Sequence, residues 1–126
     1  HVQVNAAGDL SLRGGFYDGV VKPWRIGVVN PDSRGEVIET FEISDGAIAT
    51  SGTYERGAHI HDPLNGLIAI GAKSATVTGP LGWLCDALAT ALMVSGEEGV
   101  KYFSQPELDG YKPFVIGRHE NTGWSI

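Results

Sequence analysis

The sequence predicts an α+β fold: a mostly antiparallel sheet with one buried apolar helix and a second, short helix. Apolar and polar residues alternate in several segments, as in Glu36–Ser44, and this period of two is typical of strands with one solvated face. From Pro80 to Val94 the alternation stops, and the segment PLGWLCDALATALMV is apolar on every side. Such a segment predicts a helix that is buried in a core or against a partner. Strands, then helices, then strands is the order expected of an α+β chain.

Each element has its own local signal. Residues 2–13 alternate on both sides of Gly8 and Asp9, which predicts a hairpin with its turn at these two residues. Residues 97–105 have an amphipathic pattern that predicts the second helix. The remaining strands are predicted at 24–30, 36–44, 47–51, 72–78, 113–118 and 122–126, with a loop at 14–23 and irregular chain at 52–71.

Composition sets limits on the class of protein. The 126 residues, of which 42% are apolar and 19% charged, are typical of one globular domain spanning residues 1–126. Fifteen acidic residues against nine Lys and Arg give a net charge of -6, which argues against a nucleic-acid partner. The single cysteine excludes an intrachain disulfide and a thiolate zinc site. No apolar run reaches the ~18 residues of a membrane-spanning helix, so no transmembrane span is expected.

Asp86 and Thr90 stand out within the apolar helix. They are four residues apart and therefore share one helical face, where a carboxylate and a hydroxyl offer two hard oxygen ligands for Mg²⁺. The alternative is that Asp86 is partly exposed near the start of the helix while Thr90 bonds back to a helix carbonyl. Cys85, beside Asp86, is expected to be a buried small hydrophobe rather than a nucleophile, because it has no cationic neighbour.

The segment 58–66, AHIHDPLNG, leaves three interpretations open. His59 and His61 alternate with Ile60 and could join Asp62 as ligands of a transition metal. A catalytic or ligand-contacting histidine is the second interpretation. A plain turn, with Gly66 at positive φ, is the third.

Residues 44–57, SDGAIATSGTYERG, combine small residues and hydroxyls after a tight turn. Such a run suits either a flat ligand or phosphate, or close packing between strands.

Taken together, the motifs resemble the ApbE family of FAD:protein FMN transferases. The matching motifs, in family order, are NAAGD at 5–9, PWRIGV at 23–28 followed by Asn30 and Pro31, SDGAIATSG at 44–52, YER at 54–56 with HIHDP at 59–63, and DALATAL at 86–92.

The resemblance implies an ApbE-like, T-fold-like structure and a Mg²⁺-dependent transfer of FMN from FAD to a Ser or Thr of an acceptor protein, with release of AMP. Asp86 and Thr90 would be the Mg²⁺ ligands, and His59 and Asp86 would be the catalytic residues. FAD would be held by Ser51, Gly52, Tyr54, His59 and Asp62.

The match corresponds to only the C-terminal half of a typical family member, and the first residue is His1 rather than Met. We therefore expect a processed chain or part of a longer one, with the N-terminal half of the same protein or a second chain as partner. Self-association through the apolar helix is a further expectation. The alternatives in function are a FAD-binding or FAD-hydrolysing member and a non-catalytic fragment. The resemblance implies the bacterial cell envelope, although the residues themselves leave the compartment open.

Overall fold

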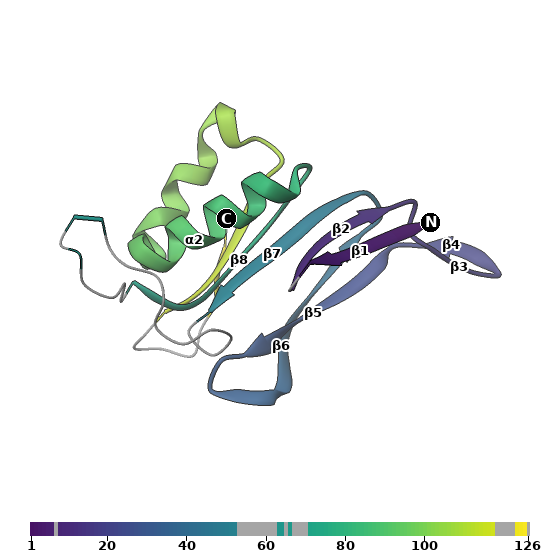
Figure 1. Cartoon of the computed structure of the whole chain (residues 1–126), viewed down its shortest axis with the longest axis horizontal. Helices are drawn as coiled ribbons and strands as arrows, with labels where there is room; N and C mark the ends of the chain where they lie inside the picture. The colour runs from purple at the N-terminus through teal and green to yellow at the C-terminus, as the bar shows by residue number, and fades with distance from the viewer. Residues whose placement is uncertain (7, 53–62, 65, 67–70, 118–122, 126) are drawn as a thin grey trace.

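The computed structural model describes residues 1–6, 8–52, 63–64, 66, 71–117 and 123–125 (Figure 1). Within these residues the chain forms an antiparallel six-stranded sheet, two separate two-stranded hairpins and three helical segments. The α+β prediction is confirmed. The sheet order is β1 (Val2–Ala6), β2 (Asp9–Arg13), β7 (Gly46–Gly52), β8 (Ala72–Gly79), β9 (Lys112–Gly117) and β10 (Gly123–Ser125). The hairpins pair β3 (Phe16–Asp18) with β4 (Val20–Lys22) and β5 (Trp24–Asn30) with β6 (Ser33–Ile43).

One face of the sheet is covered by α2 (Gly82–Ser95) and the 3₁₀ segment η1 (Gly96–Ser104), which is followed by a single 3₁₀ turn, η2 (Pro106–Leu108) (Figure 1). Their apolar side chains pack on small residues of β7 and β8. The buried members of this cluster are Ala47, Ala49, Ala72, Ala75, Val77, Cys85, Ala89, Leu92, Met93, Phe103, Tyr111 and Val115. Burial of this continuous apolar surface is the main stabilising contribution on the helix side.

The opposite face of the sheet is covered by the β5–β6 hairpin. Val28 of β5 packs with Phe114 and Ile116 of β9, and Phe41 of β6 meets the Phe114 ring edge-on at 6.0 Å between centroids. Alternate side chains of the central strands therefore point to opposite faces of the sheet: one set packs against α2 and the other against the β5–β6 hairpin.

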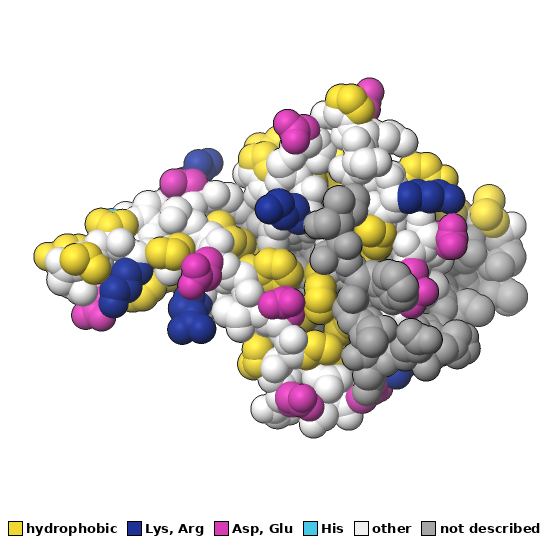
Figure 2. Space-filling model, turned by 180° about the vertical axis from the view of Figure 1, so that it is seen from behind, with side chains coloured by type: hydrophobic (Ala, Val, Ile, Leu, Met, Phe, Trp, Pro, Cys, Tyr) yellow, Lys and Arg dark blue, Asp and Glu magenta, His cyan; other side chains and the backbone are white. Residues whose placement is uncertain are grey.

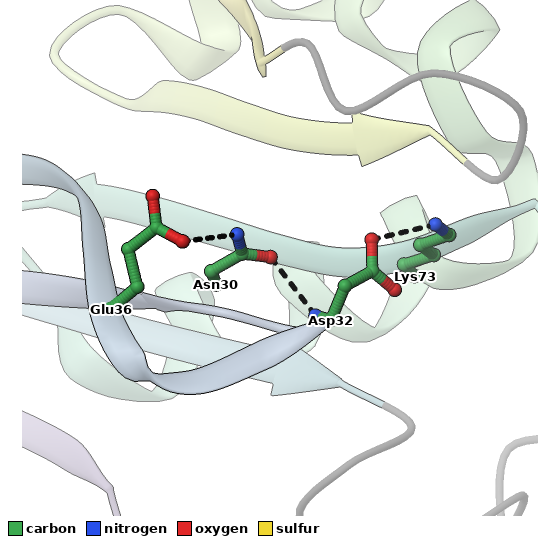
Figure 3. Close-up of polar contacts among 4 residues, drawn as sticks. All are labelled: Asn30, Asp32, Glu36 and Lys73. Carbon is green, nitrogen blue, oxygen red and sulfur yellow. Dashed lines mark hydrogen bonds and ion pairs between the residues drawn. The ribbon is translucent and has the colours of Figure 1, made fainter.

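A chain of polar contacts fixes the tip of the β5–β6 hairpin to the sheet (Figure 3). Asn30, which is buried, donates from Nδ2 to Glu36 Oε2 at 3.1 Å, and its Oδ1 accepts from the backbone N–H of Asp32 at 2.9 Å. The Asp32 carboxylate then pairs with Lys73 of β8 at 2.8 Å. The hairpin tip is thus held to β8 by an ion pair as well as by apolar packing.

Two predicted elements are wrong in detail. Residues 14–23, predicted as a loop, contain the β3–β4 hairpin, which projects beyond the sheet (Figures 1 and 2). Its strands have three residues each, too short for a periodic pattern to reveal them. The second helix is a 3₁₀ segment rather than an α-helix, and its two glycines, Gly96 and Gly99, lower the α-helix propensity. No helix in the described part of the chain is long and apolar enough to cross a membrane.

Candidate functional site

Small side chains on β7 let α2 approach the sheet closely. Ala47 and Ala49 are buried beneath the helix, and Ser51 lies on the same face of β7 because it continues their alternation. Cys85 Sγ is 3.9 Å from the backbone carbonyl oxygen of Ala47. At the other end of the contact, Ser51 Oγ and Thr90 Oγ1 are 3.5 Å apart. The C-terminal end of β7 and the middle of α2 therefore meet at a pair of hydroxyls.

Asp86 and Thr90 both lie on the exposed side of α2. One helical turn separates them, so the carboxylate and the hydroxyl share a flank of the helix and are accessible to a ligand. In the described part of the chain, α2 is buried on the side that faces the sheet, and Asp86 is exposed rather than held among apolar side chains. The reason is that the buried stripe of α2 consists of other residues: Cys85, Ala89, Leu92 and Met93.

Asp9, which the sequence analysis assigned to a turn and to the NAAGD motif, lies on the same side of the sheet as α2. In the structure it is the first residue of β2, and the alternation of the strand places it on the same face as Ser11, which pairs with Ala47. That face is the helix side, because a methyl group added at Gly82 of α2 would lie 3.2 Å from Ser11 Oγ. The alternation of Asp9, Ser11 and Arg13 is the sequence signal that could have identified this polar face.

The pKa of the Cys85 thiol reflects its surroundings near the start of α2. Burial raises its pKa to about 11, and the negative charge of Asp9 adds to the increase. The Asp9 carboxylate therefore lies near the helix, next to the turn that carries Asp86. As expected, Cys85 is a buried residue and not an activated nucleophile.

The carboxylate of Asp86 and the hydroxyl of Thr90 are oxygen ligands of the kind that a hard divalent cation prefers. Among the described residues, no cluster of three or more His, Cys, Asp or Glu side chains could hold a metal ion. Asp86 and Thr90 instead offer one carboxylate and one hydroxyl on an exposed flank, with Ser51 Oγ next to Thr90. Magnesium binds oxygen ligands of this kind and keeps several positions for water and phosphate oxygens. Asp86 and Thr90 are therefore oxygen ligands of the type that Mg²⁺ accepts.

The remaining predicted site residues are the last residue of β7 and residues that follow this strand in the sequence. Gly52 is buried and is the last residue of that strand. Gly66, which the plain-turn interpretation of residues 58–66 places at positive φ, has a φ of 71°. The other members of the predicted site fall outside the residues that the structure describes: Tyr54, His59, His61 and Asp62.

Comparison with known proteins shows which family these motifs come from. The model of the ApbE family matches residues 1–112. The chain belongs to the ApbE family. It is 41% identical over 105 residues to the FAD:protein FMN transferase of Vibrio cholerae serotype O1, covering 75% of this chain and 31% of that protein. It is 30% identical over 129 residues to the enzyme of the same name from Haemophilus influenzae, covering 94% of this chain and 36% of that protein.

Solved structures agree with this assignment. The ApbE protein of Thermotoga maritima superimposes with a TM-score of 0.78 at 32% identity, over 96% of this chain and 42% of that one. The flavin transferase ApbE of Vibrio cholerae superimposes with a TM-score of 0.76 at 33% identity, over 98% of this chain and 41% of that one. The ApbE-like fold is therefore confirmed. This chain spans about a third of the length of the curated relatives that it matches.

Proposed function

We propose that this chain carries the metal-binding and part of the nucleotide-binding machinery of a FAD:protein FMN transferase. The observation that carries the proposal is that Asp86 and Thr90 lie one turn apart on an exposed flank of α2, with Thr90 Oγ1 3.5 Å from Ser51 Oγ, in an ApbE-family chain. The curated relatives bear the name of this activity. An exposed carboxylate and hydroxyl need no rearrangement of the core to take a cation.

In the proposed reaction, a Ser or Thr hydroxyl oxygen of the acceptor protein attacks the FMN phosphorus of FAD. The bond from that phosphorus to the bridging oxygen breaks, and AMP leaves with the electron pair. A bound Mg²⁺ would neutralise charge on the diphosphate oxygens. Asp86 and Thr90 would hold the cation, and Ser51 and Gly52 at the end of β7 would bind the nucleotide.

The residues after β7 complete the proposal. From the family resemblance, His59 would either hold the nucleotide or take the proton of the attacking hydroxyl, and Tyr54 and Asp62 would bind the nucleotide; all three lie outside the residues that the structure describes. The nucleophile belongs to the acceptor protein, so this chain needs no activated Ser or Cys of its own. The high pKa of the Cys85 thiol agrees with that division of roles.

The metal assignment is tested on the chain itself by Mg²⁺-dependent binding of FAD, followed by quenching of flavin fluorescence. Asp86→Asn and Thr90→Val should lose the Mg²⁺-dependent part of the binding, whereas Glu107→Gln, an exposed carboxylate on η2, should retain it. Because Asp86 is exposed, Asp86→Asn should change the free energy of unfolding by only about 0.5 kcal/mol or less. Equal Mg²⁺-dependent binding by Asp86→Asn and the wild type would contradict the assignment.

Transfer is separated from hydrolysis in a chimera in which this chain replaces the segment of the Vibrio cholerae flavin transferase that it matches. The chimera is incubated with FAD, Mg²⁺ and an acceptor protein that has a target Thr. Covalent yellow fluorescence on a denaturing gel supports transfer. Release of free FMN and AMP without labelled acceptor would indicate a FAD-hydrolysing enzyme instead of a transferase.

A further inference from the structure

A groove opens between the six-stranded sheet and the β5–β6 hairpin, on the side of the sheet that faces away from α2. It lies where β6 turns through Ser44 and Asp45 into β7, and its volume is about 530 Å³. That volume is within the range of small-molecule pockets in proteins, roughly 300–1,000 Å³. The contact between Ser51 and Thr90 lies at the other end of β7 and on the other face of the sheet. The groove is therefore separate from the candidate site described above.

One wall of the groove is apolar and belongs to β6. Phe41 and Ile43 line it, and because they are two residues apart they share the face of β6 that packs on the sheet. Both side chains are half-buried, and Phe41 also meets Phe114 of β9 edge-on. Pro80 adds a further apolar surface to the lining. A ligand with an apolar body would remove these side chains from water.

The facing wall belongs to the sheet and carries a hydroxyl next to a cation. Thr78 of β8 and Lys112 of β9 are direct cross-strand partners, and both line the groove. Val77 belongs to the cluster under α2, so its neighbour Thr78 points to the hairpin side. Lys112 points to the same side, because it alternates with Phe114, which packs under the hairpin. An ammonium group beside a hydroxyl offers two hydrogen-bond donors to one anionic group.

Lys112 is the charged residue of the lining that lacks a counter-charge. In the described part of the chain it forms no ion pair, whereas each of the other lysines pairs with a carboxylate oxygen. The two acidic residues of the lining have partners outside the groove. Asp45 Oδ1 accepts from the backbone N–H of Gly14 at 2.9 Å. Glu42 projects from the opposite face of β6, where it lies 4.0 Å from Arg25.

We propose that this groove, lined by Phe41, Ile43, Pro80, Thr78 and Lys112, binds a small organic carboxylate that has an apolar body. The carboxylate accepts hydrogen bonds from Lys112 Nζ and Thr78 Oγ1, and the body packs against the apolar wall. A purely inorganic anion would use only the polar wall, and an apolar amine would bring a second positive charge to Lys112. The inference does not depend on the proposed transferase function, because the groove lies on the other face of the sheet.

Binding is tested with hydrocinnamate, a phenyl ring on a three-carbon carboxylate, titrated into the isotope-labelled chain and followed by amide chemical shifts. Saturable shifts are expected at Ile43, Thr78 and Lys112, with a Kd of about 1 mM, which so small a ligand can reach. Lys112→Met should raise the Kd about tenfold, because it removes a charge-assisted hydrogen bond from an exposed position that folding does not need. Lys101→Met, which removes an exposed lysine of η1, is the matched control and should leave the Kd unchanged.

Two comparison probes separate the two walls. Phenylpropylamine keeps the ring and reverses the charge, and propionate keeps the carboxylate without the ring; each should bind at least about fivefold more weakly than hydrocinnamate. No saturable shifts up to about 10 mM hydrocinnamate would overturn the proposal, as would equal affinities of the wild type and Lys112→Met. Shifts confined to α2, or equally tight binding of phenylpropylamine, would also overturn it. Propionate or inorganic phosphate binding as tightly as hydrocinnamate would do the same, because the polar wall alone would then account for the binding.

Discussion

The buried thiol of Cys85 makes the stability of the protein depend on pH in a predictable direction. Burial and the nearby charge of Asp9 raise its pKa from 9.0 to about 11. Above pH 9 the unfolded chain releases the thiol proton while the folded chain keeps it, so the free energy of unfolding falls as the pH rises. The stabilisation that the buried thiol gives the folded chain is fully present below about pH 9 and is lost by about pH 11. Two pH units at about 1.4 kcal/mol each correspond to a total loss of about 3 kcal/mol.

The assay is urea unfolding of the wild type and Cys85→Ala, with a chelator present so that no cation occupies the neighbouring residues. Between about pH 7 and pH 10.5 the free energy of unfolding of the wild type should fall by about 2 kcal/mol more than that of Cys85→Ala. The two proteins share every other titratable group, so the difference belongs to the thiol. Asp9→Asn should narrow this difference, because it removes the negative charge that helps to raise the thiol pKa. Parallel pH profiles for the wild type and Cys85→Ala would refute the reasoning.

Two further predictions concern the two faces of the sheet. The Lys73–Asp32 ion pair, 2.8 Å long and partly exposed, should give a coupling energy of about 0.5–1 kcal/mol in a double-mutant cycle of Lys73→Met and Asp32→Asn. A coupling near zero at low salt would mean that the pair does not hold the hairpin tip. Leu92→Ala, at a position only 2% exposed, should lower the free energy of unfolding by about 2–5 kcal/mol in urea titrations. A change as small as that expected for Asp86→Asn would contradict the packing of α2 on the sheet.

Local patterns were sufficient for most of the fold. The alternation in residues 2–13 predicted the β1–β2 hairpin, and the change of period at Pro80 predicted α2. These signals are readable because a strand or a helix of several turns repeats its pattern often enough to be recognised. The β3–β4 hairpin escaped prediction because three residues in each strand contain no repeat.

The candidate site was predictable only in part. The spacing of Asp86 and Thr90 places them on one helical face in any context, and the family motifs gave their proposed role. Their exposure could not be read from the sequence, since the segment is apolar on all sides and no pattern says which side meets the sheet. That choice depends on Ala47 and Ala49, whose small side chains accept the helix from a strand far away in the sequence.

The sequence by itself determined the α+β class, the family, and the pairing of a carboxylate with a hydroxyl one turn apart on α2. Only the tertiary structure decided that this pair is exposed, that Thr90 lies next to Ser51, and that Asp9 lies near the same helix. It alone also decided that Trp83 of α2 and Val2 and Val4 of β1 are exposed. The physical reason is that local periodicity orients side chains about one element, whereas burial depends on which distant elements pack against it.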